Sequence, residues 1–214
     1  ISPASAGQHI SLLKNRMIPV KKAGSKARTV LDKRLAEIYK AYEKSLKKNN
    51  AVDFDDLLLL PLQIFEKHPN VLKKYREQWK YVLVDEYQDT NRPQFLLIKM
   101  LAEGHKQICV VGDDDQSIYG WRGADVRNIL DFEKAFPGCE TYTLEKNYRS
   151  TAEILKAATT VVKNNLKRAT KELEAHNGAG EKLGLIETND EGEEADAVVN
   201  ALEKEIKLKK RAFN

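Results

Sequence analysis

The sequence predicts an α/β fold, in which a parallel sheet is flanked by helices and preceded by a helical N-terminal part. Two short, apolar, β-prone runs, residues 81–84 and 107–111, each end abruptly in acids or in a glycine followed by acids. A segment with apolar residues at helical spacing lies between them. Because parallel strands need a crossover connection of this kind, the order strand, helix, strand predicts a βαβ unit.

The N-terminal part is predicted to be helical after an irregular beginning. Residues 1–25 hold prolines and glycines among polar residues, and we expect a loop with at most one short helix there. Apolar residues then recur at helical spacing over 29–48, which predicts one long amphipathic helix. Asp53 is placed to cap a second helix that ends near Phe65, and a short third helix is predicted over 71–78.

The predicted βαβ unit follows. Its two strand runs are continuously apolar rather than alternating, which is typical of parallel strands that are buried on both faces. Pro93 stands at the expected start of the crossover helix, since proline is favoured in the first helical turn. We therefore expect two buried parallel strands joined by one helix.

A second α/β segment is expected after residues 136–138, where Phe-Pro-Gly marks a boundary. Its predicted elements are, in order, a strand over 141–144, a helix opened by a capping box at Ser150–Glu153 and running to Val162, a turn at Asn177-Gly178, a strand over 183–188 and an amphipathic helix over 195–206.

Composition and charge narrow the classes of function. The longest apolar run, residues 57–62, is far shorter than a bilayer requires, and Cys109 and Cys139 lie outside any metal-binding or disulfide pattern. We therefore expect a cytoplasmic protein without a membrane partner. Residues 1–50 carry 12 Lys and Arg against 3 acids, a formal charge of about +9 that suits a polyanion. Residues 181–200 are acidic, so the basic character is regional.

The first candidate site is the acidic pair Asp85-Glu86, directly after the first strand. Ligands of open parallel sheets bind beyond the carboxyl ends of the strands. One carboxylate there could hold a hard cation such as Mg2+, and a second could orient or deprotonate a water for phosphoryl transfer. The alternative, that the two acids merely cap the following helix, carries equal weight on this pair alone.

The second candidate site is the loop after the second strand, residues 112–123. Three consecutive acids, Asp113 to Asp115, are costly to place together unless a cation, donors or solvent lie near them. Tyr119 and Trp121 are large rings in this polar loop, and Arg122 follows them. Bases of single-stranded nucleic acid stack on such rings while arginine engages phosphate. Trp121 could equally anchor the loop to the core.

Three runs of the sequence resemble consecutive helicase motifs of the UvrD/PcrA/Rep family of superfamily-one DNA helicases. They are Asp85-Glu86-Tyr87-Gln88-Asp89-Thr90-Asn91, the segment from Val111 to Gly123, and Leu144-Glu145-Lys146-Asn147-Tyr148-Arg149-Ser150-Thr151. Residues 52–58 also resemble the segment that precedes these motifs in the family. The resemblance covers roughly residues 30–205 and keeps the order and spacing of the motifs.

The resemblance implies a role for each candidate residue. Asp85 would hold Mg2+, Glu86 would activate the attacking water, and Gln116 would sense the γ-phosphate of ATP and report to the DNA site. Tyr119 and Trp121, beside Arg122, would stack on bases of single-stranded DNA. Tyr148 would stack on adenine, and Arg149 would reach the γ-phosphate from a second motor domain.

The resemblance also implies a division of the chain. Residues 1–50 would be the helical part of subdomain 1B, residues 51–137 the C-terminal half of the RecA-like P-loop motor domain 1A, and residues 138–214 the beginning of motor domain 2A. The complete enzyme would use ATP and Mg2+ to move 3′ to 5′ along single-stranded DNA and to act at duplex junctions. The chain lacks an initiator Met and is interpreted as an internal piece.

One departure from the family pattern affects the expected activity. No Gly-x-x-x-x-Gly-Lys-[Ser/Thr] loop, which would cradle the β- and γ-phosphates, occurs in the 214 residues. We therefore expect the chain alone to be inactive. Three alternatives stay open: the helicase portion of a helicase-nuclease, a single-stranded-DNA-binding module that has lost catalysis, and a metal-dependent phosphohydrolase built on residues 113–115.

Overall fold

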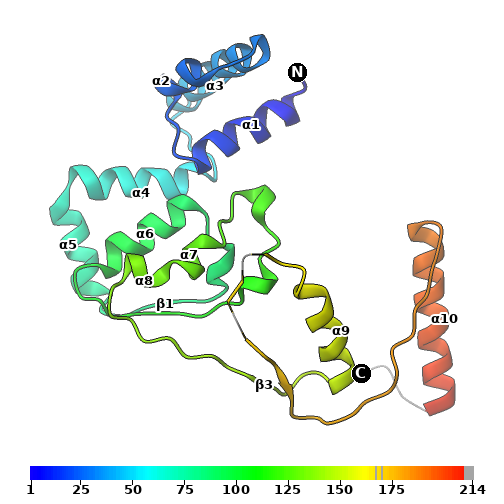
Figure 1. The fold of residues 1–214 in the computed structure, drawn as a ribbon. Helices are drawn as coiled ribbons and strands as arrows, with labels where there is room; N and C mark the ends of the chain where they lie inside the picture. The colour runs from blue at the N-terminus through cyan, green and yellow to red at the C-terminus, as the bar shows by residue number, and fades with distance from the viewer. Residues whose placement is uncertain (167, 170, 210–214) are drawn as a thin grey trace. The chain divides into compact units, whose positions relative to one another are not determined.

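The structure is a computed structural model that describes residues 1–209 except 167 and 170 (Figure 1). The chain divides into two compact units. Unit 1 contains residues 1–142 and 165–170, and unit 2 contains residues 143–164 and the chain from 171 onward. Helices and small parallel sheets occur together, so the chain is of the α/β class, as predicted.

Unit 1 holds the elements from α1 to α8. Its helices are α1 (Pro3–Asn15), α2 (Val20–Ala23), α3 (Val30–Lys48), α4 (Asp56–Lys67), α5 (Pro69–Gln78), α6 (Arg92–Ala102), α7 (Arg127–Leu130) and α8 (Phe132–Ala135), and its strands are β1 (Val82–Val84) and β2 (Ile108–Val110). Unit 2 holds β3 (Lys146–Asn147), α9 (Ala152–Val162), β4 (Glu174–Ala175) and α10 (Glu191–Lys209).

The first 25 residues contain more helix than the sequence predicted. Helix α1 runs for 13 residues from an N-cap at Ser2, and it buries Ala6, Ile10 and Lys14, which are spaced four residues apart on one face. This face packs against α3. Gly7 lies inside α1, but its propensity cost of about 1 kcal/mol is smaller than the gain from burying that face.

The following helices agree with the prediction. The long helix α3 begins with a capping box formed by Thr29 and Asp32, and Tyr39 on its inner face joins a small apolar core with Ile10 and Ala23. Helix α4 begins where Asp53 accepts a hydrogen bond from the backbone N–H of Asp56, at 2.9 Å. The N-cap of α4 is nevertheless Asp55, whose side chain makes no capping hydrogen bond, so the predicted cap at Asp53 is not the N-cap of this helix. Helix α4 packs against α5 and α6.

The predicted βαβ unit is confirmed. Strands β1 and β2 pair in parallel, with Val82 opposite Ile108 and Val84 opposite Val110, and α6 connects them and contacts β1. The expectation that both faces are buried is wrong. Leu83 is 78% exposed and its register partner Cys109 is exposed as well, because side chains alternate along a strand and only Val82 and Val84 turn toward the half-buried face.

Unit 2 departs from the prediction in its strands. Residues 141–144 and 183–188 are not strands, and Leu144 and Leu185 are 81% and 92% exposed. A β-prone run becomes a strand only where a neighbour completes its hydrogen-bond ladder, and in unit 2 the described ladder joins β3 to β4 instead. The helices α9 and α10 are both present, although α10 begins four residues earlier than expected.

The predicted capping box of α9 does not form. The N-cap is Thr151, whose side chain makes no capping hydrogen bond. The Glu153 carboxylate instead accepts a hydrogen bond from the N–H of Gly180, which follows the turn at Asn177. A non-local donor has therefore replaced the local partner that a capping box requires.

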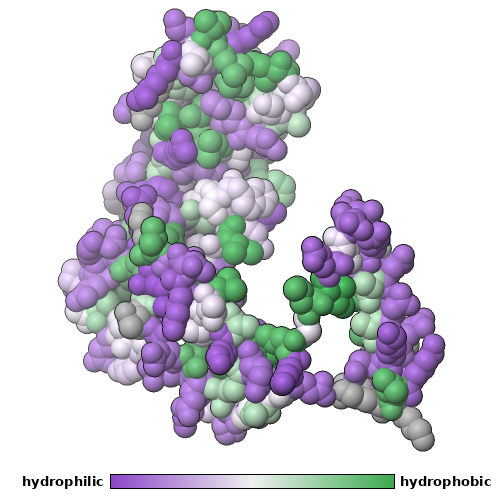
Figure 2. Space-filling view, turned by 45° about the vertical axis from the view of Figure 1, so that its right-hand side comes forward, coloured by the Kyte–Doolittle hydropathy of each residue, from purple (hydrophilic) through white to green (hydrophobic). Residues whose placement is uncertain are grey.

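The surface of the N-terminal helices is mixed. Figure 2 shows hydrophobic side chains interspersed with hydrophilic ones over the region of α1 to α3, and Val30 and Leu31 are among the exposed apolar residues. In the part of the chain that the structure describes, no helix is both long enough and apolar enough to cross a membrane.

Candidate active site and nucleic-acid-binding loop

The acidic residues predicted as a site lie at one edge of the β1–β2 sheet. Asp85 and Glu86 follow β1 directly, and Asp113 follows β2 after two residues. Because the strands are parallel, both loops leave the sheet at its carboxyl edge. Asp85 and Glu86 are exposed, whereas Asp113 is half-buried. The edge therefore presents two accessible carboxylates to a ligand.

Glu86 has a backbone conformation that is uncommon for a residue with a side chain. Its φ of 48° and ψ of 43° lie in the left-handed region, which costs energy outside glycine and is often found at functional sites. Its N–H donates to Asp85 Oδ1 at 2.9 Å. Asp85 Oδ2 has no protein partner among the described residues, so one oxygen of this exposed carboxylate is available to a hard cation.

A buried glutamine connects the two loops. Gln88 is 1% exposed, and its Nε2 donates to Glu86 Oε2 at 2.8 Å while its Oε1 accepts from the N–H of Asp113 at 3.0 Å. Asp113 Oδ2 in turn accepts from Gln116 Nε2 at 2.8 Å. The structure therefore joins Glu86 and Gln116, two predicted site residues, through a continuous series of hydrogen bonds.

Tyr87 anchors this edge in the core. Its side chain is fully buried and packs edge-on against Phe132, with ring centroids 5.5 Å apart. Burial raises the pKa of the Tyr87 phenol to about 12. Burial, followed by the charge of Glu86, also raises the pKa of the Asp89 carboxyl above its ordinary value. Tyr87 thus fixes the turn that carries Gln88.

The three consecutive acids have a cation beside them. Arg168 makes a two-pronged ion pair with Asp115, from Nε to Oδ1 at 3.0 Å and from Nη2 to Oδ2 at 2.8 Å. The side chain of Asp115 is only 6% exposed, and the N–H of Ala169 donates to Asp114 at 2.8 Å. Across the described residues, no group of three His, Cys, Asp or Glu side chains is arranged to hold a metal. The triplet is therefore accommodated by Arg168 and backbone donors.

The predicted stacking loop is open to solvent. Trp121 is 73% exposed and Tyr119 38%, with ring centroids 6.5 Å apart. The guanidinium carbon of Arg122 lies 4.5 Å from the Trp121 ring centroid and 5.2 Å from that of Tyr119. At this exposure Trp121 is not a core anchor. Arg122 covers the rings rather than standing beside them, as a cation–π contact.

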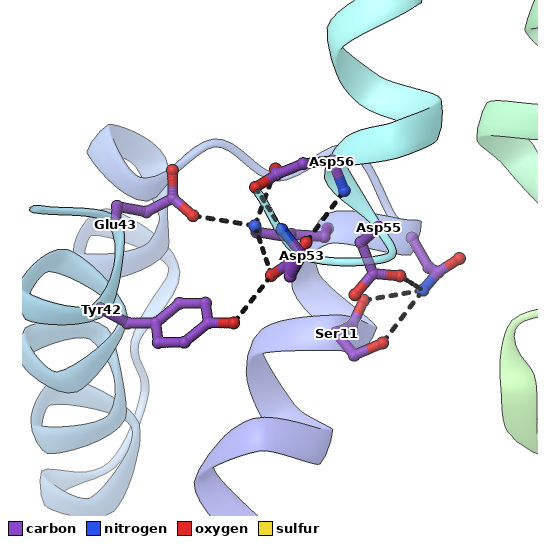
Figure 3. Close-up of polar contacts among 8 residues, drawn as sticks. Ser11, Tyr42, Glu43, Asp53, Asp55 and Asp56 are labelled. Carbon is purple, nitrogen blue, oxygen red and sulfur yellow. Dashed lines mark hydrogen bonds and ion pairs between the residues drawn. The ribbon is translucent and has the colours of Figure 1, made fainter. Parts of the chain in front are cut away.

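A buried lysine, Lys14, joins α1 to α3 and to the start of α4. Figure 3 labels its partners Tyr42, Glu43, Asp53 and Asp56. We call Lys14 and its partners Tyr42, Glu43, Asp53 and Asp56 the Lys14 cluster. Nζ of Lys14 lies 2.8 Å from Asp53 and Asp56 and 2.9 Å from Glu43, where the geometry is that of an ion pair rather than an aligned hydrogen bond. Burial alone would lower the pKa of Lys14, but the three carboxylates outweigh it and raise the pKa above its usual range.

The neighbouring Asn15 extends these contacts to the α/β part. Its Nδ2 donates to Asp55 at 2.9 Å, and its Oδ1 accepts from Asn91 Nδ2, at the start of α6, at 2.6 Å. A Cβ on Gly123, whose φ is 89°, would come within 3.3 Å of Asn15. Helix α1 therefore packs directly against the end of the stacking loop.

The other predicted nucleotide-site residues lie in unit 2. Tyr148 is 65% exposed, and its ring centroid is 4.7 Å from that of His176. Arg149 is exposed, and its N–H donates to Asn147 Oδ1 at 3.0 Å. The structure brings Glu86 and Gln116 together within unit 1 and holds Tyr148 and Arg149 side by side within unit 2.

Three residues that contact the acidic residues were not predicted from the sequence: Gln88, Arg168 and Lys14. Gln88 stands two residues after Glu86, and its position in a short helical turn was the available signal. Arg168 pairs with an acid 53 residues away, and Lys14 pairs with acids 29 to 42 residues away, so no local pattern marks either residue.

Comparison with known families identifies the family of the chain. Residues 2–137 match the model of the UvrD/REP helicase N-terminal domain, and residues 142–213 match that of the UvrD-like helicase C-terminal domain. Together the two matches span nearly the whole chain. The chain belongs to the UvrD/Rep helicase family, which confirms the resemblance seen in its motifs.

Curated relatives place it more closely. The chain is 47% identical over 195 residues to a protein named ATP-dependent DNA helicase PcrA from Staphylococcus aureus (strain Mu50 / ATCC 700699), and 46% identical to the protein of that name from Staphylococcus epidermidis (strain ATCC 12228 / FDA PCI 1200). Each match covers 91% of this chain and 27% of the relative. The chain thus spans about a quarter of the length of these relatives.

Proposed function

We propose that the whole protein carrying this chain is an ATP-dependent DNA helicase, in which unit 1 contributes part of a RecA-like P-loop motor. The observation that carries the proposal is the series of hydrogen bonds from Glu86 through Gln88 and Asp113 to Gln116. It connects an acidic sheet edge, suited to phosphoryl transfer, with the loop that exposes Tyr119 and Trp121.

The acidic edge fits a nucleotide site. Asp85, whose Oδ2 has no protein partner within the described part of the chain, would hold Mg2+, which binds one or two carboxylates and completes its shell with water and phosphate. The metal would neutralise charge on the phosphates of ATP. Glu86 would orient the attacking water and accept its proton, with its carboxylate held by the amide donor of Gln88. Gln116 would sense the γ-phosphate.

Unit 2 would complete the nucleotide site in the proposed enzyme. Tyr148 would stack on adenine and Arg149 would reach the γ-phosphate, as residues of motor domain 2A. The assignment of residues 1–50 to subdomain 1B, 51–137 to domain 1A and 138–214 to domain 2A belongs to this proposal. The exposed ring of Tyr148 and the exposed side chain of Arg149 support the two proposed contacts with the nucleotide.

Single-stranded DNA would bind the loop of Tyr119 and Trp121. The whole enzyme would move 3′ to 5′ along this strand and would act at duplex junctions. A base that stacks on Trp121 must use the ring face away from Arg122 or displace its guanidinium. Displaced from the rings, Arg122 would be free to engage a phosphate. The 73% exposure of Trp121 supports a role in binding. Stacking a base on this large ring would remove apolar surface from water, which is favourable.

Two alternatives remain compatible with the same residues. A helicase-nuclease would share these motifs, and a binding module without catalysis would share the DNA loop. The 214-residue chain contains no phosphate-binding loop sequence, so we propose that it does not hydrolyse ATP by itself. An independent phosphohydrolase site at residues 113–115 is disfavoured, because Arg168 already pairs with Asp115.

Replacing Trp121 with Ala in the full-length protein is expected to weaken binding of single-stranded DNA by about 1 to 3 kcal/mol, the usual value of one base–aromatic stack. Titration with fluorescent oligo-dT measures the loss, and the melting temperature should stay unchanged because the ring is mostly exposed. Trp79, which packs on Tyr75 with ring centroids 4.9 Å apart, supplies the control. If Trp79→Ala weakens binding as much as Trp121→Ala, the DNA assignment of the loop is wrong.

A further inference from the structure

Gln88 is the most enclosed polar side chain at the candidate site that the helicase assignment leaves without a role. It lies in the turn Tyr87–Asp89, is 1% exposed, and uses both ends of its amide. Nε2 donates to Glu86 Oε2 at 2.8 Å and also lies 3.4 Å from Asp89 Oδ2, while Oε1 accepts from Asp113 N–H. A buried amide with its donor and acceptor satisfied is held in one orientation.

The surrounding backbone leaves room for this amide and for little else. A Cβ on Gly112 would lie 2.5 Å from Gln88 Oε1 and 3.1 Å from the backbone nitrogen of Tyr87. Ser117 Oγ also donates to the Gln88 carbonyl at 3.2 Å. The backbone and side chain of Gln88 therefore both contact the loop that leads to Tyr119 and Trp121.

The chemistry of the two contacts requires an amide. Glu86 is exposed and, without a donor, its carboxylate would sample several rotamers. A carboxylate at position 88 could accept from Asp113 but would repel Glu86, and an apolar side chain would make neither bond. Among uncharged side chains of this length, glutamine alone can donate to Glu86 and accept from Asp113 at once.

We propose that Gln88 is a positioning residue that holds the Glu86 carboxylate in its productive orientation and couples it to the loop carrying Gln116 and the DNA-stacking rings. The proposal rests on the proposed function, since it takes Glu86 as the base for the attacking water. Movement of the 113–117 loop when DNA binds would then reach Glu86 through two hydrogen bonds. Gln88 touches neither nucleotide nor DNA in this scheme.

The test compares Gln88→Leu with Gln94→Leu in the full-length protein. Gln94 is the control, because its side chain also makes a local hydrogen bond without contact to Glu86: its Oε1 accepts from the N–H of Asn91 in the capping box of α6, while its backbone N–H donates to Asn91 Oδ1. Gln88→Leu should lower the kcat of DNA-stimulated ATP hydrolysis by roughly 10- to 100-fold, the usual cost of a misplaced catalytic group. KM for ATP and affinity for oligo-dT should stay within about 3-fold, because neither contact is removed. Gln94→Leu should leave kcat within about 3-fold of the wild-type value.

A double-mutant cycle with Glu86→Gln separates this proposal from the proposed function. If Glu86→Gln retains wild-type turnover, the catalytic assignment itself fails. Suppose instead that Glu86→Gln keeps only a small residual turnover. If Gln88→Leu lowers this residual turnover by the same factor as it lowers wild-type turnover, Gln88 does not act through Glu86 and the proposal is wrong. The expected result is that Gln88→Leu has no further effect in the Glu86→Gln background.

A second measurement covers the case in which Gln88→Leu does not fold. Gln88→Met keeps the volume with a flexible apolar chain and should show the same loss of kcat. Independently, the N–H of Asp113 in the wild-type chain should exchange with solvent at least about tenfold more slowly than in an unstructured peptide, because Gln88 accepts from it. Unprotected exchange at Asp113 would overturn the proposal without any variant.

Discussion

Replacing Lys14 with Met is expected to lower the free energy of unfolding by about 3 to 5 kcal/mol, since removing one partner of a buried ion pair leaves uncompensated charges. Lys14 is 1% exposed, and Asp53, Asp56 and Glu43 converge on its Nζ with 13% to 26% of their side chains exposed. Met fills the space of the aliphatic stem but leaves three carboxylates facing one another. The loss should be largest in α1, α3 and the start of α4, which the cluster joins.

Urea denaturation of the 214-residue chain, followed by circular dichroism, measures this change. Lys134→Met is the matched control. Its ammonium pairs with Asp131 at 2.7 Å but is 78% exposed, so its removal should cost no more than about 1 kcal/mol. Equal effects of the two substitutions would mean that burial of Lys14 adds nothing to the stability of this part.

Replacing Glu86 with Gln is expected to reduce the turnover of ATP by the full-length protein by about 10²- to 10⁴-fold, the usual contribution of a general base. The amide keeps the shape of the side chain but cannot accept the proton of the attacking water. Asp85 and its contact with the N–H of residue 86 are unchanged, so nucleotide affinity should be retained. Loss of turnover with retained binding is the signature of an interaction made in the transition state.

Steady-state phosphate release and binding of a fluorescent nucleotide analogue separate the two effects. Glu103→Gln, which alters a 61% exposed carboxylate 4.0 Å from Arg76, should leave both unchanged. Turnover of Glu86→Gln within a few-fold of wild type would remove Glu86 from the proposed chemistry.

The periodic elements were predictable because local sequence decides them. The apolar runs that form β1 and β2, and the apolar spacing of α3, α6 and α9, each match one period over their whole length. The length of helix α1 was underestimated because burial of Ile10 and Lys14 against distant residues, rather than propensity, stabilises it. The β-prone runs at 141–144 and 183–188 failed for the converse reason, since residues 146–147 and 174–175 form the ladder.

The candidate site also combines residues that local sequence predicts with long-range contacts that it does not predict. Asp85, Glu86 and the loop with Trp121 were predictable, because acids at a strand end and rings in a polar loop are local signals. The contacts that orient them were not. Gln88 reaches Asp113 across 25 residues, and Arg168 reaches Asp115 across 53, so only the folded chain shows that the acids have these partners.

Phosphate release from ATP and Mg2+ by the full-length protein, measured with and without oligo-dT, tests most directly whether the acidic edge is coupled to the stacking loop. Coupling of the acidic edge to the stacking loop predicts that release rises at least about tenfold on addition of DNA, as expected when DNA contacts assemble the catalytic geometry. The 214-residue chain alone should release none above buffer, because it lacks a phosphate-binding loop sequence. Release by the full-length protein that is the same with and without DNA, or DNA-stimulated release by the chain alone that Glu86→Gln abolishes, would contradict the account.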